Sequence, residues 1–421
     1  MGTLGVQAVS GIVRAYRYRL YPTSRQEAEL REWQSACVRA WNLCLEQREL
    51  VRRDPRWRDQ VTFRARARKG EGRVQPQWVE LAEACEADEH LARPLRACLY
   101  YVIDELDRGF QNAYQALRAG VAPSQCPWPR WRSRYRPPAL TFGSHPSTHR
   151  VRIDGKRGWL WLGKLSPQLG QVKFRAHRPL PEGAKLGEAK VYEDRAGRWY
   201  MSLVVRLGNA PPVAADPPTL GINRGLTVFC ATSDGELVER PHYWRMYAAE
   251  LVELDRRIAR AQRGSRRRRQ LLRQRARLWQ AVTARRRQFA SELAAHLLDR
   301  TSSLAIEQYD VRGMLTDERP ELYRTEVSAL RRKIADAGWS VFADVLRAKA
   351  EERGARIVAV PCRDISRLCA ECGERLHDAE VDAAMRWRRE VLCHRCGSVQ
   401  HVDVMAARNV LARALEEVAR A

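Results

Sequence analysis

Long apolar segments are missing from this 421-residue sequence. No run of about 18 apolar residues occurs, so no membrane-spanning helix is expected. The first twenty residues lack the charged start and the long apolar stretch of a secretory signal. The 11 cysteines are odd in number and thinly spread, which disfavours a disulfide framework. These absences predict a cytoplasmic protein with no membrane partner.

Negative charge is also scarce. Only 50 Asp and Glu stand against 75 Lys and Arg, and the formal net charge is +25. This balance indicates a polyanionic partner. Because 45% of the residues are hydrophobic and 13 are Trp, packed cores can form and a disordered basic tail is excluded.

The periodicity of the first half predicts a helical block set within a β domain. Residues 12–22 alternate apolar or aromatic with basic side chains, which is typical of a half-buried strand with a basic outer face. Thr23 or Ser24 then caps a stretch of helical spacing that reaches about residue 117. Short strand patterns separated by turns occupy about 139–210.

The second half alternates strands and helices, which predicts an α/β core. Residues 219–235 predict a buried strand, a glycine turn and a second strand, and residues 303–314 begin with a buried strand ending in Glu307. A helix followed by a strand is predicted over 333–361. Between Arg256 and Ser291 there are 14 Arg and no acidic residue, so these helices need an anion to relieve their self-repulsion, unless they form a merely solvated hairpin.

Two C-x2-C pairs near the C-terminus predict a zinc site. Twenty residues separate the pairs, and each pair is followed by a glycine that suits a metal knuckle. The four expected ligands are Cys369, Cys372, Cys393 and Cys396. A site of four thiolates is structural, and redox chemistry of the pairs is the alternative. Three nearby groups are interpreted as lying outside the site: Cys362, His394 and His401.

Four segments together resemble one family. They are Arg14–Leu30 (RAYRYRLYPTSRQEAEL), Gly221–Leu226 (GINRGL), Ala305–Glu307 (AIE) and His401–Asn409 (HVDVMAARN). In this order, and with the zinc knuckles before the last, they are similar to the TnpB family of transposon-encoded RNA-guided nucleases and to miniature type V CRISPR effectors. The resemblance covers nearly the whole chain.

The resemblance implies a RuvC-like α/β core of the RNase H type with a four-cysteine zinc ribbon, joined to a β-rich wedge domain that a helical recognition domain interrupts. The implied boundaries are 1–23 for the first wedge strand, 24–138 for the helical recognition domain, 139–215 for the wedge β domain, 216–364 for the RuvC-like core with its Arg-rich helices, 365–400 for the zinc ribbon, and 401–421 for the last RuvC segment and C-terminal helix.

The family's three RuvC segments carry Asp, Glu and Asp, which hold two Mg²⁺ ions for phosphodiester cleavage. The second and third correspond to Glu307 and Asp403, but the first falls on Asn223. An amide keeps one acceptor oxygen and loses the charge, a loss of about 2 to 3 kcal/mol or roughly a hundredfold in metal affinity or rate. Met405 also stands where the family usually has Asn. We therefore expect weakened Mg²⁺ binding and weak or absent cleavage.

Alternatives to an inactive site remain. Asn223 is either a tolerated variant of an active endonuclease or a substitution introduced into one. Six nearby acids are candidates to replace the missing negative charge, although none occupies the strand position of the first carboxylate. They are Asp216, Asp234, Glu236, Asp364, Asp378 and Asp382. An RNA-binding zinc-ribbon protein without guide or target is a third possibility, which leaves Glu307 and Asp403 unexplained.

By the resemblance, the partners are a guide RNA and a target double-stranded DNA, with base pairing reading the sequence. Arg supplies nearly all of the positive charge and grips phosphates bidentately. The candidate nucleic-acid contacts lie on the first strand, in the linker of Pro, Trp and Arg at 126–138, and on the Arg-rich helices. They are Arg17, Arg19, Arg130, Arg132, Arg134, Arg267, Arg268, Arg273 and Arg275.

Overall fold

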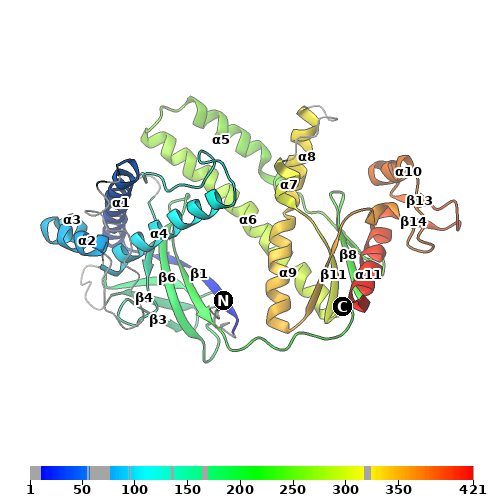
Figure 1. Ribbon diagram of the computed structural model, residues 1–421, viewed down its shortest axis with the longest axis horizontal. Coiled ribbons are helices and arrows are strands. Elements are labelled where there is room, and N and C mark those ends of the chain that lie inside the picture. The colour runs from blue at the N-terminus through cyan, green and yellow to red at the C-terminus, as the bar shows by residue number, and fades with distance from the viewer. Residues whose placement is uncertain are drawn as a thin grey trace. The chain divides into compact units, whose positions relative to one another are not determined.

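The computed structural model (Figure 1) describes residues 11–54, 56, 76–92, 94, 96–133, 137–163, 169–316 and 324–420. They divide into two compact units, the first formed by Val13–Gly208 and the second mainly by the chain from Asn209 onward. No helix within the described ranges has the length and apolar character needed to cross a membrane.

The first unit combines an antiparallel sheet with a set of helices. Its seven strands are β1 (Val13–Tyr21), β2 (Leu140–Phe142), β3 (His149–Asp154), β4 (Arg157–Leu162), β5 (Gln171–Arg175), β6 (Lys185–Glu193) and β7 (Trp199–Arg206), in the order β2-β6-β7-β1-β5-β4-β3. Its helices are α1 (Ser24–Arg53), α2 (Pro76–Ala87), α3 (Glu89–Ala92) and α4 (Arg96–Arg118). The helices lie between β1 and β2 in sequence, so they interrupt the β structure as the sequence predicts.

Strand β1 shows the predicted alternation. Tyr16, Tyr18 and Leu20 are buried in the core shared with α1 and α4, while Arg17 and Arg19 are exposed on the opposite face. Thr23 then begins α1 with a capping box: its hydroxyl accepts from the Gln26 N–H, and the Gln26 side chain accepts from the Thr23 N–H. The basic face of β1 therefore follows from the period of the strand.

A buried polar cluster joins three of the helices. Arg48 of α1 lies 2.6 Å from the Asp107 carboxylate of α4 and donates to the Gln77 amide oxygen of α2 at 2.7 and 2.9 Å. All three side chains are buried. Because each of the charged groups has a hydrogen-bonded partner, the desolvation cost of the ion pair is offset and the helices are held in one register.

The second unit is built on a mixed sheet. Its strands are β8 (Leu220–Arg224), β9 (Val228–Thr232), β10 (Leu237–Glu239), β11 (Ser303–Gln308) and β12 (Arg356–Pro361), in the order β10-β9-β8-β11-β12. Strands β8, β11 and β12 are parallel, whereas β9 and β10 are antiparallel. In the parallel pair, Gly221 lies opposite Ala305 and Ile222 opposite Ile306.

Helices cover both faces of this sheet. The helices of the unit are α5 (Ala248–Arg260), α6 (Arg266–Arg300), α7 (Val311–Thr316), α8 (Arg324–Ala337), α9 (Trp339–Arg353), α10 (Asp378–Ala383) and α11 (Val402–Arg420); α6 and α9 pack on one face of the sheet and α11 on the other. Ile222 and Ile306 pack in the core formed with α6 and α9, while Ala305 packs with Ala406 and Val410 of α11 on the other face. Residues of one strand therefore alternate between two cores.

The prediction for 333–361 was wrong in one respect. Two helices, α8 and α9, precede β12, because Gly338 adopts a left-handed conformation (φ 71°) that ends one helix and starts the next. Strand β10 was not predicted, since its three residues are too short to show a period. Within the Arg-rich segment, Gly264 lies between α5 and α6 at φ 81°.

Candidate functional site

Helix α11 approaches β8 unusually closely at Gly221. A Cβ atom at this position would lie 2.4 Å from the Ala407 carbonyl oxygen and 2.8 Å from the Leu411 Cβ. A Cβ at Gly225 would lie 3.5 Å from a carboxylate oxygen of Asp403. Gly221 therefore lets α11 pack closely against β8, and Gly225, just after the carboxyl end of the strand, lies beside Asp403 in the first turn of the helix.

Asn223 lies at this end of β8, on the same side of the strand as Gly221, which faces α11. The residue is half-buried, and within the described ranges its side chain makes no hydrogen bond to another residue. Its amide is thus placed toward the start of α11 and is available to a ligand.

Glu307 lies near the carboxyl end of the neighbouring strand β11, and only 1% of its side chain is exposed. One carboxylate oxygen accepts from the Arg224 backbone N–H at 2.6 Å and from the Arg224 Nε at 3.0 Å. The other oxygen, Oε2, is buried and has no hydrogen-bond partner among the described residues. Burial raises the pKa of Glu307, although the Arg224 guanidinium opposes that shift.

Asp403 is the second residue of α11. Its carboxylate contacts the Arg389 guanidinium, and its backbone N–H donates to the His401 Nδ1 at 3.3 Å. Arg389 itself has a left-handed backbone (φ 62°) just before the short strand β13 (Glu390–Leu392), a conformation that non-glycine residues rarely adopt. A carboxylate at the first turn of a helix is also favoured by the helix dipole.

The structure thus brings the three predicted positions to one edge of the sheet: the carboxyl ends of β8 and β11 and the start of α11. The positions of the donor atoms suit a divalent cation, because Glu307 Oε2 is a buried oxygen without a partner among the described residues and Asp403 offers a second carboxylate. The net charge of the site suits a cation less well. Asn223 is neutral, and both carboxylates already contact an arginine.

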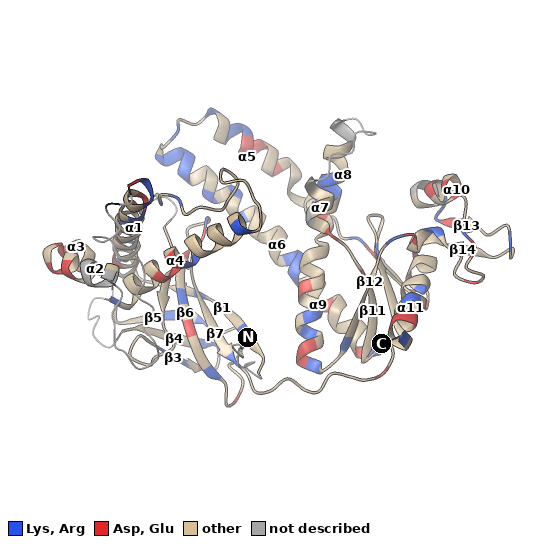
Figure 2. Ribbon diagram, in the orientation of Figure 1, with Lys and Arg blue, Asp and Glu red and all other residues tan. Residues whose placement is uncertain are grey.

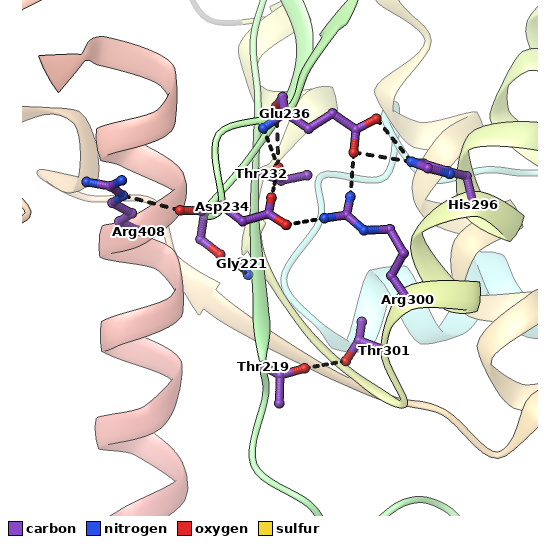
Figure 3. A network of polar contacts seen from close by, with 10 residues as sticks. Thr219, Gly221, Thr232, Asp234, Glu236, His296, Arg300, Thr301 and Arg408 are labelled. Carbon is purple, nitrogen blue, oxygen red and sulfur yellow. Dashed lines mark hydrogen bonds and ion pairs between the residues drawn. The ribbon is translucent and has the colours of Figure 1, made fainter.

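Three acids that were considered as substitutes for the first carboxylate are engaged elsewhere. Asp234 and Glu236 both contact the Arg300 guanidinium, and Glu236 also lies 3.0 Å from the His296 Nε2 (Figure 3). Asp364 pairs with Arg375 at 3.1 Å. These acids fasten the β9–β10 turn and the cysteine-containing region, so none of them supplies the missing charge at β8.

The four predicted cysteines converge. Their sulfur atoms all lie within 4.8 Å of one another, with 3.7 Å between Cys369 and Cys396 and 3.6 Å between Cys372 and Cys393. These separations fit four thiolates around one Zn²⁺ at Zn–S distances of about 2.3 Å. Convergence of both pairs on one point favours a structural zinc site over separate redox pairs.

Each zinc knuckle closes in the same way. Gly373 donates to the Cys369 carbonyl at 3.0 Å and Gly397 to the Cys393 carbonyl at 2.8 Å, both with φ above 70°. Two polar side chains that the sequence analysis did not identify also reach the sulfurs: Gln400 Nε2 lies 3.2 Å from Cys369, and Ser398 Oγ lies 3.2 Å from Cys396. Such contacts orient the thiolates. Strands β13 and β14 (Val399–His401) carry the second knuckle.

The predicted nucleic-acid arginines differ in their surroundings. Arg17, Arg19, Arg130, Arg267 and Arg273 are exposed. The N-terminal half of α6, which contains the last two, forms a band of basic residues (Figure 2). Arg134 lies outside the described residues.

The remaining three arginines make internal contacts. Arg132 stacks 3.5 Å from the centre of the Trp41 ring and pairs with Glu105 at 2.9 Å. Arg268 donates to the Ile258 carbonyl at the end of α5, and Arg275 pairs with Asp255 at 2.7 Å. These contacts hold the linker and the α5–α6 hairpin, and the role of the three arginines toward nucleic acid stays a prediction.

Two arginines of the site were missed by the sequence analysis. Arg224 directly follows Asn223 and ends a buried strand, which is a detectable signal because a buried charge needs a partner. Arg389 is separated from Asp403 by two short strands and the cysteine knuckle between them, and nothing in its local sequence indicates the contact.

Comparisons with known proteins agree with this geometry. Three family models match: a helix-turn-helix domain over residues 12–52, the "Probable transposase" domain of the OrfB/IS605 type over 202–317, and the Cas12f1-like TNB domain over 339–410. Together they cover the start of the chain, the β7–α7 region and the cysteine-containing region.

Two curated proteins match along nearly their whole length. A protein of Streptomyces pristinaespiralis named as an RNA-guided DNA endonuclease is 30% identical over 415 residues, which is 96% of this chain and 90% of that protein. The RNA-guided DNA endonuclease InsQ of Escherichia coli K12 is 23% identical over 405 residues, 95% of this chain and 92% of that protein.

A solved structure supports the fold. The protein of a Cas12f1–sgRNA–target DNA complex aligns with a TM-score of 0.56 and 11% identity over 96% of this chain and 99% of that one. The resemblance seen in the sequence is therefore confirmed by the matching family models, by a relative at 30% identity over its length and by the fold, and the chain belongs to the TnpB family of RNA-guided DNA endonucleases.

Proposed function

We propose that this protein binds double-stranded DNA under the direction of a guide RNA and cuts it weakly or not at all, so that occupancy of the target is its output, as in transcriptional blocking. One observation carries the proposal: the carboxyl end of β8, where Asp403 lies beside the Gly225 turn, presents the amide of Asn223. In this proposal the edge carries one negative charge fewer than the three carboxylates that the resemblance implies.

The relatives support the partners. Both curated relatives are named as RNA-guided DNA endonucleases, and the Cas12f1 structure is a complex with guide RNA and target DNA. The net charge of +25 and the basic part of α6 suit the same polyanions. In this proposal β1–β7 form the wedge domain, α1–α4 the recognition domain, β8–β12 with α5–α9 the RuvC-like core, and residues 365–400 the zinc ribbon.

Asn223, Glu307 and Asp403 are the residues that would hold Mg²⁺, which in such a site activates water and stabilises the leaving oxygen of a phosphodiester. Removing one charge at roughly 4 Å costs a few kcal/mol, even with the strong screening of a partly solvated site. Arg224 and Arg389 further reduce the net negative charge at this edge. We therefore expect low occupancy by Mg²⁺.

The second candidate function is an active Mg²⁺-dependent endonuclease. Its support is the unpartnered Oε2 of Glu307, since a buried carboxylate oxygen without a donor is the kind of ligand that a cation would take. The two functions predict different products from the same bound target.

The test compares the chain with its Asn223→Asp variant, each purified with a co-expressed guide RNA. Retention of a labelled target duplex and cleavage of each strand are measured in Mg²⁺. We expect both proteins to retain the target with similar affinity and only the Asp variant to cut it, at least a hundredfold faster. Equal cleavage rates would show that Asn223 supports catalysis and would favour the endonuclease.

A further inference from the structure

The second turn of α11 is fastened to the sheet where the helix packs against β8. The Nε of Arg408 donates to the Ser233 carbonyl oxygen in the β9–β10 turn at 3.2 Å (Figure 3). The Ser233 N–H in turn donates to the Gly221 carbonyl at 2.8 Å, and the Gly221 N–H donates to the Ser233 hydroxyl at 3.1 Å. Arg408 directly follows Ala407, whose carbonyl lies against Gly221, so its side chain extends the contact with β8 to the neighbouring turn.

The same guanidinium reaches the first zinc knuckle. The Nη1 of Arg408 donates to the carboxylate of Glu371, inside the knuckle, at 3.0 Å. The next residue, Asn409, donates to the carbonyls of Ile365 and Leu368 at 2.8 and 2.7 Å, just before the knuckle. The planar fork of an arginine aims Nε and Nη1 at two acceptors at once, which the single ammonium of a lysine does not do. Arg408 therefore joins the β9–β10 turn and the knuckle to one point of α11.

The β9–β10 turn is itself held from its other side. Arg300, the last residue of α6, contacts the carboxylates of both Asp234 and Glu236 in this turn (Figure 3). The position of the Ser233 carbonyl is therefore set by β8 and by α6, and Arg408 transfers that position to α11.

What α11 carries at its start is the carboxylate of Asp403. Asp403 lies in the first turn and Arg408 in the second, so a rotation or a shift of the helix moves both together. The side chains of Arg408 and Glu371 are 45% and 55% exposed. Exposed ion pairs contribute little to stability. The consequence of these contacts is therefore where Asp403 stands, rather than how stable the fold is.

We propose that Arg408 is a positioning residue for the cation site: through the Ser233 carbonyl it fixes α11 so that the Asp403 carboxylate lies beside the carboxyl ends of β8 and β11. The inference rests on the proposed function, which places a cation site at this edge. A positioning role and a purely electrostatic role differ in sign. As a nearby positive charge alone, Arg408 repels a cation and its removal strengthens cation binding, whereas loss of its positioning weakens binding.

The test measures binding of Mn²⁺ by electron paramagnetic resonance to the zinc-loaded, RNA-free full chain with Asn223→Asp, which restores the third carboxylate. Mn²⁺ takes the same oxygen ligands as Mg²⁺. We expect Arg408→Gln to raise the Kd for Mn²⁺ about tenfold, at the lower end of the effect of residues that orient metal ligands. Arg408→Lys keeps the charge but not the fork, and we expect it to raise the Kd at least threefold. The melting temperature and the zinc content stay unchanged in both variants.

Three further variants separate the contacts. Asp403→Asn removes the Mn²⁺ signal and so assigns it to this edge. Arg420→Gln removes an exposed arginine at the far end of α11, paired with Glu416 within the helix, and changes no value. Glu371→Gln leaves the bond from Arg408 to the Ser233 carbonyl in place, so we expect the Kd for Mn²⁺ to stay the same.

Each other result overturns the inference. Unchanged affinity in both Arg408 variants does so, as does tighter binding in Arg408→Gln, which would mean a purely electrostatic role. A melting temperature that falls together with the affinity would mean general structural support. Equal losses in Glu371→Gln and Arg408→Gln would place the control of Asp403 in the knuckle and not in the turn. If the Asn223→Asp chain binds no Mn²⁺, the proposed cation site fails as well, whereas binding that ignores Arg408 overturns this inference alone.

Discussion

Arg224 binds Glu307 through its backbone and its side chain together: the Glu307 carboxylate accepts from the Arg224 N–H at 2.6 Å and Nε at 3.0 Å, and the Glu307 carbonyl accepts from the Arg224 Nη2 at 2.6 Å. The guanidinium also lies 5.0 Å from the centre of the Tyr309 ring, whose hydroxyl donates to the Arg224 carbonyl. These contacts join the carboxyl ends of β8 and β11, where the proposed site lies.

Removing this arginine is expected to destabilise the second unit strongly. The Arg224→Ala variant removes the guanidinium from the buried carboxylate of Glu307, which keeps only the bond from the backbone N–H of residue 224, and the loss costs about 3 to 5 kcal/mol. Urea unfolding measures the loss. The control is Arg353→Ala, which breaks an exposed pair with Asp299 and costs less than about 1 kcal/mol. Similar urea midpoints for the two variants would contradict a structural role of the Arg224–Glu307 pair.

The Gly221→Ala substitution is expected to push α11 away from β8. The new Cβ would meet the Ala407 carbonyl at 2.4 Å, a backbone atom that cannot move aside alone, so the cost is about 1 to 3 kcal/mol. Thermal unfolding measures it. At Gly208 an added Cβ meets nothing within 4 Å, so Gly208→Ala serves as the control and leaves stability nearly unchanged. If both variants melt alike, the close approach of α11 is not a constraint.

Loss of one cysteine ligand is expected to abolish the zinc site. Cys396→Ala leaves three thiolates, and because binding of structural zinc is coupled to local folding, the variant loses its metal and becomes more sensitive to protease around residues 369–401. Metal analysis is expected to give about one zinc per wild-type chain and none in the variant. Cys362→Ala, an exposed cysteine outside the cluster, keeps its zinc. Full zinc content in Cys396→Ala would refute the four-thiolate assignment.

Acidification is expected to destabilise the first unit through His149. Burial lowers the pKa of this histidine in the folded state, against the effect of its backbone contact at Gly143. Only the unfolded chain then takes up a proton near pH 6.5, so stability is complete above that pH and declines as pH falls toward the folded-state pKa. In thermal melts from pH 7.5 to 5, His149→Gln is expected to flatten this decline. His145→Gln, at an exposed histidine, keeps it.

The sequence by itself determined the features that depend on periodicity or on the spacing of residues along the chain. The alternation in β1 set its basic face, because a strand has a fixed period of two. The spacing of the four cysteines was enough to predict their convergence, since a tetrahedral ion accepts few arrangements. The order of the segments around Asn223, Glu307 and Asp403 indicated the family.

Only the tertiary structure decided which charges meet. Arg389 contacts Asp403 across a zinc knuckle, and Arg19, Arg175 and Arg157 form a row because three strands distant in sequence pair in one register. Arg132 and Arg275, which the sequence analysis proposes as phosphate contacts, also pair with Glu105 and Asp255. The energy of two charges depends on the distance between them in space, and for residues far apart in the sequence that distance is set only by the fold.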